Sequence, residues 1–233
     1  MNRIKIALLI AVLALAEGCA STLQAKPEHQ TNAFKENTKG RVIVEAVVPH
    51  VHASTKVNWS AYDKVILKPV TISDDLSSQV SHEEQEELVG LANSFYKMLS
   101  EKLSNDYVLV ERATPGSMVI EVAITHAEPS WIAPQVLSKV SWQLQALNSV
   151  VRYFRGKPAF AGEITIEFSV HDSLTGELLF AGTDRRVGGQ NLFDKEAFNS
   201  WGDVQNSLEF WTDQSTYQLC LARRGSNCSP PKA

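Results

Sequence analysis

The chain has 233 residues, of which 44% are hydrophobic and 21% are charged, as in an ordinary globular protein. These values exclude an intrinsically disordered chain and a polytopic membrane protein. The formal net charge of -4 provides no basic excess to neutralise a phosphate backbone, which disfavours nucleic-acid binding. We therefore expect a folded, mildly acidic protein without a nucleic-acid partner.

The chain begins with an export signal, which we assign to residues 1–18. Arg3 and Lys5 precede the apolar run from Ile6 to Ala16, which is shorter than the about 20 residues that cross a bilayer. Gly18-Cys19-Ala20 resembles the end of a bacterial lipobox and predicts lipidation of Cys19. Ala14-Leu15-Ala16 offers ordinary signal peptidase another site, which would release a soluble periplasmic protein.

Residues 19–40 are predicted to form a lipid-anchored flexible tether, because the sequence from Ala20 to Gly40 is mainly polar and offers almost nothing to bury. As a coil, this tether would reach about 25 Å. Ala20, rather than Asp, directly after Cys19 resembles Gram-negative lipoproteins that are sorted to the outer membrane. Residues 41–233 are then expected to form a single α+β globular domain on the periplasmic side, with a C-terminal disulfide tail.

The first elements of this domain are two strands and a helix. Short apolar runs predict strands over residues 42–48 and 64–70. Ser81 and Glu84 have the spacing of a capping box, which predicts that a helix begins there. The helix repeats apolar residues every three or four positions, so one face should be buried: Leu88, Leu91, Ala92, Phe95, Leu99 and Leu103.

Two further strands and a second helix follow. Residues 107–110 and 118–125 predict strands joined by a tight connection, since Thr114-Pro115-Gly116 breaks the chain between them. The second strand should turn one apolar face to the core: Met118, Ile120, Val122 and Ile124. Apolar spacings of three and four predict an amphipathic helix over 137–154.

The last third of the chain predicts a hairpin and a final helix. Residues 163–170 alternate between apolar and polar, and the turn from Asp172 to Glu177 contains Gly176, which can adopt a positive φ. A returning strand spans 178–184, and Asp203 is expected to cap the last helix. The fold class is therefore α+β, with a mixed, largely antiparallel sheet and about three amphipathic helices in two layers.

The three cysteines divide into one lipid attachment site and one pair. With Cys19 lipidated, Cys220 and Cys228 remain, and in an oxidising compartment they predict a disulfide that ties the tail to the last helix. Zinc binding is the alternative, but the two thiols lack a nearby His or a second Cys pair at ligand spacing.

Histidines supply the other hints of a metal site. His50 and His52 share a face of an extended chain but lack a third ligand nearby. His82 and Glu86 stand at i, i+4, as in half of a zinc-protease helix, but Glu86 occupies the place of the second histidine. We assign no catalytic residue, no metal site and no cofactor.

A group of Arg, Trp and Asp residues is the candidate binding site. Arg and Trp are frequent in binding hot spots, so we assign this role to Arg185, Arg186, Trp201 and Asp203. The Gly188-Gly189 pair beside them would give the backbone freedom to admit a ligand. The structural alternative is an ion pair between Arg186 and Asp203 that holds the last helix against the hairpin.

Five motifs occur together: Gly18-Cys19-Ala20, Asn58-Trp59-Ser60 with Tyr62, the turn from Asp172 to Glu177, Asp184-Arg185-Arg186, and Trp201-Gly202-Asp203-Val204. This combination resembles the bacterial lipoprotein family catalogued as domain of unknown function 3313. The resemblance implies an exported, membrane-anchored α+β domain and carries over no catalytic residue.

The function we expect is that of a non-enzymatic binding or interaction module. Cys19 would anchor it to the periplasmic face of the outer membrane, where an envelope protein would be its partner. The alternative is a soluble periplasmic enzyme or metal-binding protein, released by ordinary signal peptidase, with a dispersed site that uses His50, His52 or His82.

Overall fold

The computed structural model describes residues 22–25, 51–53, 57–130, 161–188, 200–223 and 228–231. In chain order its elements are β1 (Thr22–Ala25), β2 (Val51–Ala53), the 3-10 helix η2 (Trp59–Ala61), β3 (Lys64–Leu67), β4 (Thr71–Ile72), α2 (Asp74–Gln79), α3 (His82–Leu103), β5 (Val108–Leu109), β6 (Ser117–Glu128), β7 (Glu163–Asp172), β8 (Leu178–Gly188) and α5 (Gly202–Ala222). The α+β class predicted from the sequence is confirmed.

The strands form one mixed sheet with the order β1-β8-β7-β6-β3-β5, in which β2 also pairs with β8 and β4 with β6. The long central strands β6, β7 and β8 are antiparallel to one another. The short strands β3, β4 and β5 are paired in parallel. The sheet is therefore antiparallel over most of its length, as predicted.

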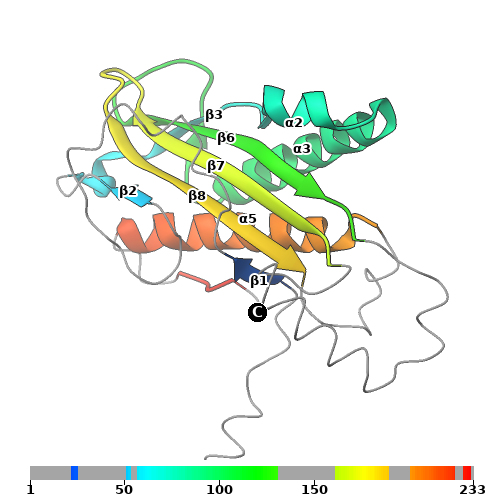
Figure 1. Ribbon diagram of the computed structural model, residues 1–233. Helices are drawn as coiled ribbons and strands as arrows, with labels where there is room; N and C mark the ends of the chain where they lie inside the picture. Colours follow the sequence, from blue (N-terminus) through cyan, green and yellow to red (C-terminus); the bar gives the residue numbers. More distant parts are fainter. Residues whose placement is uncertain are drawn as a thin grey trace, which may run out of the picture.

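The helices α3 and α5 lie side by side against one face of this sheet (Figure 1). Phe95 of α3 and Trp211 of α5 face each other with ring centroids 6.3 Å apart. Lys102 and Asp213 join the same two helices further along, by an ion pair of 2.7 Å. The core lies between these helices and the apolar face of β6 and β7.

The sequence prediction for α3 is confirmed in detail. Ser81 caps the helix, and its side chain accepts the Glu84 backbone N–H while the Glu84 carboxylate accepts the Ser81 backbone N–H at 2.9 Å. All six residues of the predicted apolar face are buried in the core: Leu88, Leu91, Ala92, Phe95, Leu99 and Leu103. The rhythm of apolar residues thus fixed which face of α3 packs against the sheet.

The hairpin between β7 and β8 is also confirmed. Asp172 accepts the backbone N–H groups of Leu174 and Thr175 with one carboxylate oxygen, at 3.0 and 2.8 Å. Gly176 adopts a φ of 72°, a conformation that a residue with a side chain rarely takes. Together these contacts close the turn and set the register of the two strands.

The connection between β5 and β6 differs from the predicted one. Both strands pair in parallel with β3, which lies between them, so they are not neighbours. Gly116, with a φ of 77°, ends the connecting loop, and its carbonyl accepts the backbone N–H groups of Asp63 and Lys64. The local sequence predicts the turn but carries no information on the strand that inserts between the two.

The predicted tether also needs correction, because residues 22–25 form β1. This strand pairs with β8 in antiparallel register from Thr22 opposite Gly188 to Ala25 opposite Arg185. The short segment Thr-Leu-Gln-Ala gave no signal of a strand, because β1 is held by hydrogen bonds to β8 and to two buried charged side chains rather than by a run of apolar residues. The helix α2 was likewise not predicted; its N-cap is Ser73, whose side chain accepts the Leu76 backbone N–H. The strand predicted over 42–48 and the helix over 137–154 lie outside the described residues.

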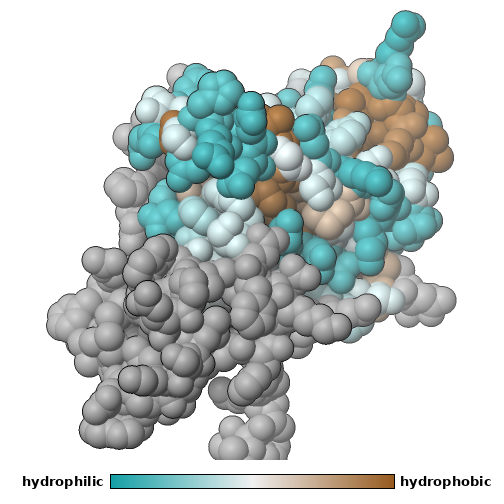
Figure 2. Space-filling model, turned by 90° about the vertical axis from the view of Figure 1, so that its right-hand side faces the viewer, coloured by the Kyte–Doolittle hydropathy of each residue, from teal (hydrophilic) through white to brown (hydrophobic). Residues whose placement is uncertain are grey.

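Large apolar side chains reach the surface at several places in the described segments: Val89, Tyr96, Val108, Leu109, Leu174 and Leu221. Among the described residues, the space-filling view shows mainly hydrophilic side chains, with the largest apolar area at the upper right and smaller apolar patches near the centre (Figure 2). None of the helices in the described part of the chain has both the length and the apolarity needed to cross a membrane.

Candidate functional site

Asp184 and Arg186 lie inside the molecule, between the sheet and α5. They are only 2% and 6% exposed. The Asp184 carboxylate accepts the indole N–H of Trp211 at 2.6 Å and the side-chain amide of Gln24 at 3.1 Å. The Asp184–Arg186 ion pair is longer, at 3.9 Å. The carboxylate therefore joins β8 to α5 and to β1.

The guanidinium of Arg186 is enclosed in a similar way. Its Nε donates to the Thr22 hydroxyl at 2.8 Å, and one terminal nitrogen lies 3.4 Å from the Thr22 carbonyl oxygen. Its central carbon lies 3.5 Å from the centre of the Phe210 ring, a cation–π contact. Arg186 thus uses its charge to fix β1 and α5 to β8.

Burial dominates the electrostatics of this pair. It raises the pKa of Asp184, while the hydrogen bond from Trp211 and the charge of Arg186 oppose that rise. It lowers the pKa of Arg186, against the attraction of Asp184. Both charges carry a desolvation cost that the surrounding donors and the ring offset, which is typical of a buried structural network.

The predicted ion pair between Arg186 and Asp203 does not form. Asp203 does not cap α5 either, because the N-cap residue is Trp201, without a side-chain hydrogen bond. The Asp203 carboxylate instead accepts the backbone N–H of Gly162 at 2.8 Å and lies directly against Gly188. Gly188 is therefore required for close approach rather than for backbone freedom, since a Cβ there would overlap the carboxylate.

Trp201 is buried as well, and it connects the two helices. It is 6% exposed, and its indole N–H donates to Glu87 of α3. Arg185 is 4% exposed. The structure thus places three of the four candidate binding residues inside the protein, with partners from neighbouring elements.

Arg185 projects to the other face of the sheet, where it meets a cluster of ionisable side chains. Its guanidinium donates to Oε2 of Glu163 at 2.6 Å. Oε1 of Glu163 lies 2.8 Å from Nε2 of His126, and Oε1 of Glu128 lies 3.5 Å from the same nitrogen. Glu163 is buried, whereas the side chains of His126 and Glu128 are 41% and 52% exposed. We call these four residues the His126 cluster.

A β-bulge in β6 builds the His126 cluster. Up to Ile124, which pairs with Ile166, the even-numbered residues of β6 face the helices. The register shifts between Ile124 and His126, so His126 pairs with Thr165 and turns to the opposite face. Ala127 takes over the core position, and Glu128 comes to lie beside Glu163. Bulges commonly re-aim side chains in this way.

Sequence reasoning did not find the His126 cluster. An unbroken alternation from Met118 would place His126 and Glu128 on the apolar face. One signal could have revealed the bulge: the apolar positions change from even to odd numbers at Ala127, which lies between the polar residues His126 and Glu128. Glu163 and Arg185 are visible in the sequence, but their meeting depends on the register of β7 and β8.

The His126 cluster contains the one group of three metal-ligating side chains found in the described part of the chain. One atom each from His126, Glu128 and Glu163 lie within 4.8 Å of one another. One imidazole with two carboxylates suits zinc or a similar divalent ion, which takes three protein ligands and water in open sites. Arg185 already neutralises one carboxylate, which weakens the attraction for a cation.

The other histidines form no such group within the described segments. His82 lies 3.6 Å from Glu86 at the exposed start of α3, so the predicted neighbours do meet. His52 lies in β2, opposite Ala181 of β8. His50 lies outside the described residues.

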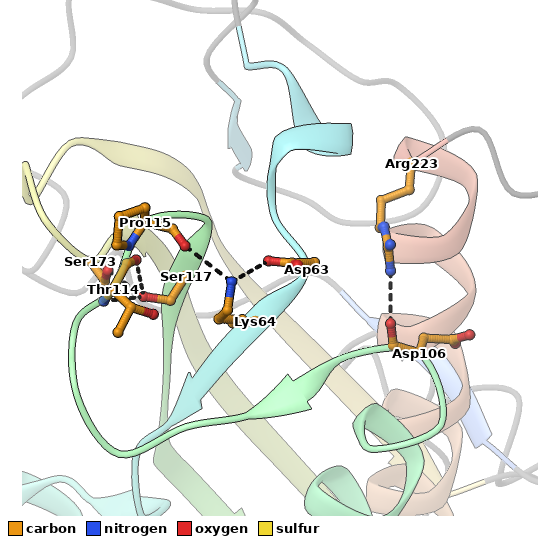
Figure 3. A network of polar contacts seen from close by, with 8 residues as sticks. All are labelled: Asp63, Lys64, Asp106, Thr114, Pro115, Ser117, Ser173 and Arg223. Carbon is orange, nitrogen blue, oxygen red and sulfur yellow. Dashed lines mark hydrogen bonds and ion pairs between the residues drawn. The ribbon is translucent and has the colours of Figure 1, made fainter.

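A second polar network lies at the opposite end of the sheet (Figure 3). The Lys64 ammonium donates to Asp63 at 2.9 Å and to the Pro115 carbonyl at 3.2 Å. The hydrogen bond from Lys64 to Asp63 lowers the pKa of Asp63. Ser117 and Ser173 share a hydrogen bond of 2.6 Å. Beside them Arg223, at the end of α5, donates to the Asp106 carbonyl. These contacts tie the starts of β3 and β6 to the β7–β8 turn.

Cys220 and Cys228 are joined in a disulfide, with their Cα atoms 5.7 Å apart. The bond connects the last turn of α5 to the C-terminal segment. Nearby, the guanidinium of Arg223 lies 4.6 Å from the ring centre of Tyr107. The end of α5 is thus fixed both covalently and by a cation–π contact.

Comparison with solved structures finds folds of low similarity. The PelC dodecamer from Paraburkholderia phytofirmans matches with 10% identity and a TM-score of 0.38, covering 76% of this chain and 97% of that one. Protein XCC0632 from Xanthomonas campestris matches with 10% identity and a TM-score of 0.41, covering 76% and 96%. The lipoprotein GNA1162 from Neisseria meningitidis matches with 13% identity and a TM-score of 0.30, covering 57% and 88%.

Curated protein sequences give no match. The family described as a protein of unknown function, DUF3313, matches residues 44–215, which include β3 to β8 and most of α5. The resemblance found in the sequence motifs is thereby confirmed. The chain belongs to the DUF3313 family of proteins of unknown function.

Proposed function

We propose that the protein is a cell-envelope lipoprotein, anchored through Cys19 on the periplasmic face of the outer membrane, and that its domain is a non-enzymatic binding module. The observation that carries this proposal is Gly18-Cys19-Ala20 directly after a charged and apolar export signal. The disulfide between Cys220 and Cys228 supports it, because such bonds persist in oxidising compartments such as the periplasm.

The surface that best suits a protein partner is the outer edge of β5. The backbone N–H groups of Val108 and Val110 point toward β3 and donate to the carbonyl oxygens of Asp63 and Val65, at 3.0 and 2.9 Å. β5 ends the strand order of the described sheet, and Val108 is 61% exposed. An open edge with exposed apolar side chains can accept a strand from a partner. We assign this edge to an envelope protein.

A site-specific photo-crosslinking experiment tests the partner. A photoreactive residue replaces Val108 in one variant and Leu174 in the other, since these side chains are 61% and 59% exposed. We expect a discrete adduct in intact cells from position 108 and none from position 174. Equal labelling at both positions would show that the β5 edge is not the binding surface.

The intact mass of the mature protein from fractionated envelopes tests the anchor. We expect a mass that begins at Cys19, carries diacylglycerol and N-acyl groups, and gains two hydrogens when Cys220–Cys228 is reduced. A lipid-free mass in the soluble periplasmic fraction would support the alternative instead, a soluble periplasmic protein released by ordinary signal peptidase.

A second candidate function, binding of a divalent metal ion, is favoured by one observation. His126, Glu128 and Glu163 bring three ligand atoms together, whereas the sequence pointed to other histidines. Chelator-treated protein should then bind one equivalent of zinc, and His126→Ala should abolish that binding. Glu121→Gln, an exposed change on β6, is the control that should retain it. Absence of binding to the wild type would exclude this function.

A further inference from the structure

The position of β1 fixes how far the domain can lie from its lipid anchor. β1 begins at Thr22, only three residues after Cys19. Three residues of fully extended chain span about 10 Å. The predicted tether, by contrast, would allow about 25 Å of free movement. The length of chain between the acylated residue and the first paired strand is therefore short enough to restrict the domain.

The attachment of β1 to the domain is specific. Thr22 is 2% exposed, and its hydroxyl and carbonyl both accept from the buried Arg186. Gln24 donates to the buried Asp184. Four residues of β1 also pair with β8, ending with Thr22 opposite Gly188. A strand that satisfies two buried charges is fixed in place rather than loosely laid on the edge of the sheet.

Thr22 marks one particular end of the molecule. Gly188, the last residue of β8, lies there with Asp203 against it, and Ser200 comes directly before Trp201, the N-cap of α5. The β7–β8 turn with Leu174 lies at the other end of β8, whose 11 residues span about 33 Å. Figure 1 shows the same arrangement, with β1 beside the arrowhead of β8 and the turn at the far end.

We infer that β1 holds the Gly188 end of the domain at the membrane surface, within about 10 Å of the acylated Cys19, and turns the opposite end into the periplasm. This inference rests on the proposed lipidation of Cys19. The occupant of this end is the lipid surface itself, because the chain leading to the anchor leaves the fold at Thr22. The β5 edge is then presented away from the membrane, since Val108 pairs with Lys64 near Gly116 at the far end.

Charge at the membrane-facing end shapes the contact. Glu83 and Glu84 lie in the first turn of α3, which reaches this end through the bond from Trp201 to Glu87, and Glu128 is half exposed nearby. Anionic lipid headgroups would repel these carboxylates over a screening length of about 8 Å in physiological salt. This distance is similar to the span of the linker. The domain thus stands on the membrane at the end of its linker rather than lying flat on it.

Energy transfer to labelled lipid tests the orientation. Acylated full-length mature protein carries a single donor dye on Ser200→Cys or Leu174→Cys, both exposed positions, in phosphatidylcholine vesicles that contain an acceptor lipid. The native cysteines are unreactive here, because Cys19 is acylated and Cys220 is bonded to Cys228. We expect a larger loss of donor fluorescence from position 200 than from position 174.

Two matched insertions separate a short linker from a long tether. Eight Gly and Ser residues placed between Ser21 and Thr22 lengthen the linker to about 18 Å, and they should remove the difference between the two dyes. The same insertion after Ala25 leaves the linker unchanged, and the difference should remain. If both insertions act alike, or if acylated wild type shows equal transfer from both positions, this inference is wrong. A mass without acyl groups would instead overturn the proposed function together with it.

Discussion

The indole nitrogen of Trp211 lies 2.6 Å from Oδ2 of Asp184, and this hydrogen bond joins α5 to the central sheet. Both side chains are buried, so no water replaces either partner. The same carboxylate accepts from Gln24 of β1 through its other oxygen. One buried Asp therefore determines the positions of a helix and an edge strand that are far apart in the sequence.

Trp211→Phe should destabilise the protein by about 1.5 to 3 kcal/mol, because it removes a donor from a buried charged acceptor. Trp201→Phe is the matched control, since its indole N–H donates to Glu87, an exposed residue that water can solvate. Its cost should be clearly smaller. Urea unfolding of both variants measures the difference, and equal losses would contradict the role assigned to Asp184.

Asp184→Asn should change how stability depends on pH. Burial raises the pKa of Asp184 above its ordinary value of 3.8, so the folded state binds the proton more tightly than the unfolded state. The resulting stabilisation is present below pH 3.8 and is lost as the pH rises through the folded pKa. The stability of the variant relative to wild type should therefore increase with rising pH over this range.

Asp63→Asn provides a control of opposite sign. The hydrogen bond from Lys64 lowers the pKa of Asp63 below 3.8, so its stabilisation is present above that pH and is lost as the pH falls. The stability of Asp63→Asn relative to the wild type should therefore decrease as the pH rises. Chemical denaturation at a series of acidic pH values distinguishes the two, and trends of the same sign would contradict the assignment.

The sequence predicted those parts of the fold that local rules determine. The capping box of Ser81 and Glu84, the buried face of α3 and the turn with Gly176 each depend on residues within a few positions of one another. Period and turn chemistry describe such contacts well. The α+β class followed from the same local information.

Long-range pairing could not be predicted in this way. Thr22 is 164 residues from Arg186, and nothing near either residue signals their hydrogen bond. Asp203 has the residue type and position of a helix cap, yet it bonds the backbone of Gly162 instead. The His126 cluster depends on a single shift of register in β6. Each of these features is decided by how strands meet, which a single sequence does not specify.

The wild type should lose stability at alkaline pH through ionisation of Tyr62, and Tyr62→Phe should not show this loss. Burial, followed by the hydrogen bond to Asp172 at 2.9 Å, raises the pKa of Tyr62 to about 12. The ordinary value is 10.0, so this stabilisation is complete below pH 10 and disappears as the pH approaches 12. Wild type should lose stability over this interval relative to the variant.

Spectroscopic titration provides an independent measurement of the same group. Burial also raises the pKa of Tyr107, so tyrosinate absorbance of the folded wild type should show a late-titrating component to which both Tyr62 and Tyr107 contribute. Tyr62→Phe should lower the amplitude of this component by one phenol. Tyr96→Phe, at an exposed position of α3, is the control and should retain that late component. If the late component of Tyr62→Phe were as large as that of the wild type, Tyr62 would not contribute to it and the assignment would be wrong.

Gly188→Ala should destabilise the protein, whereas Gly90→Ala should stabilise it. At Gly188 an added Cβ would overlap the carboxylate of Asp203, so either the start of α5 or the end of β8 must move. At Gly90, in the exposed middle of α3, no atom lies within 4 Å of an added Cβ. Alanine there should add about 0.5 to 1 kcal/mol, because it favours the helix over the unfolded chain. Thermal and urea unfolding of both variants check the pair, and a neutral Gly188→Ala would show that Asp203 does not depend on this close approach.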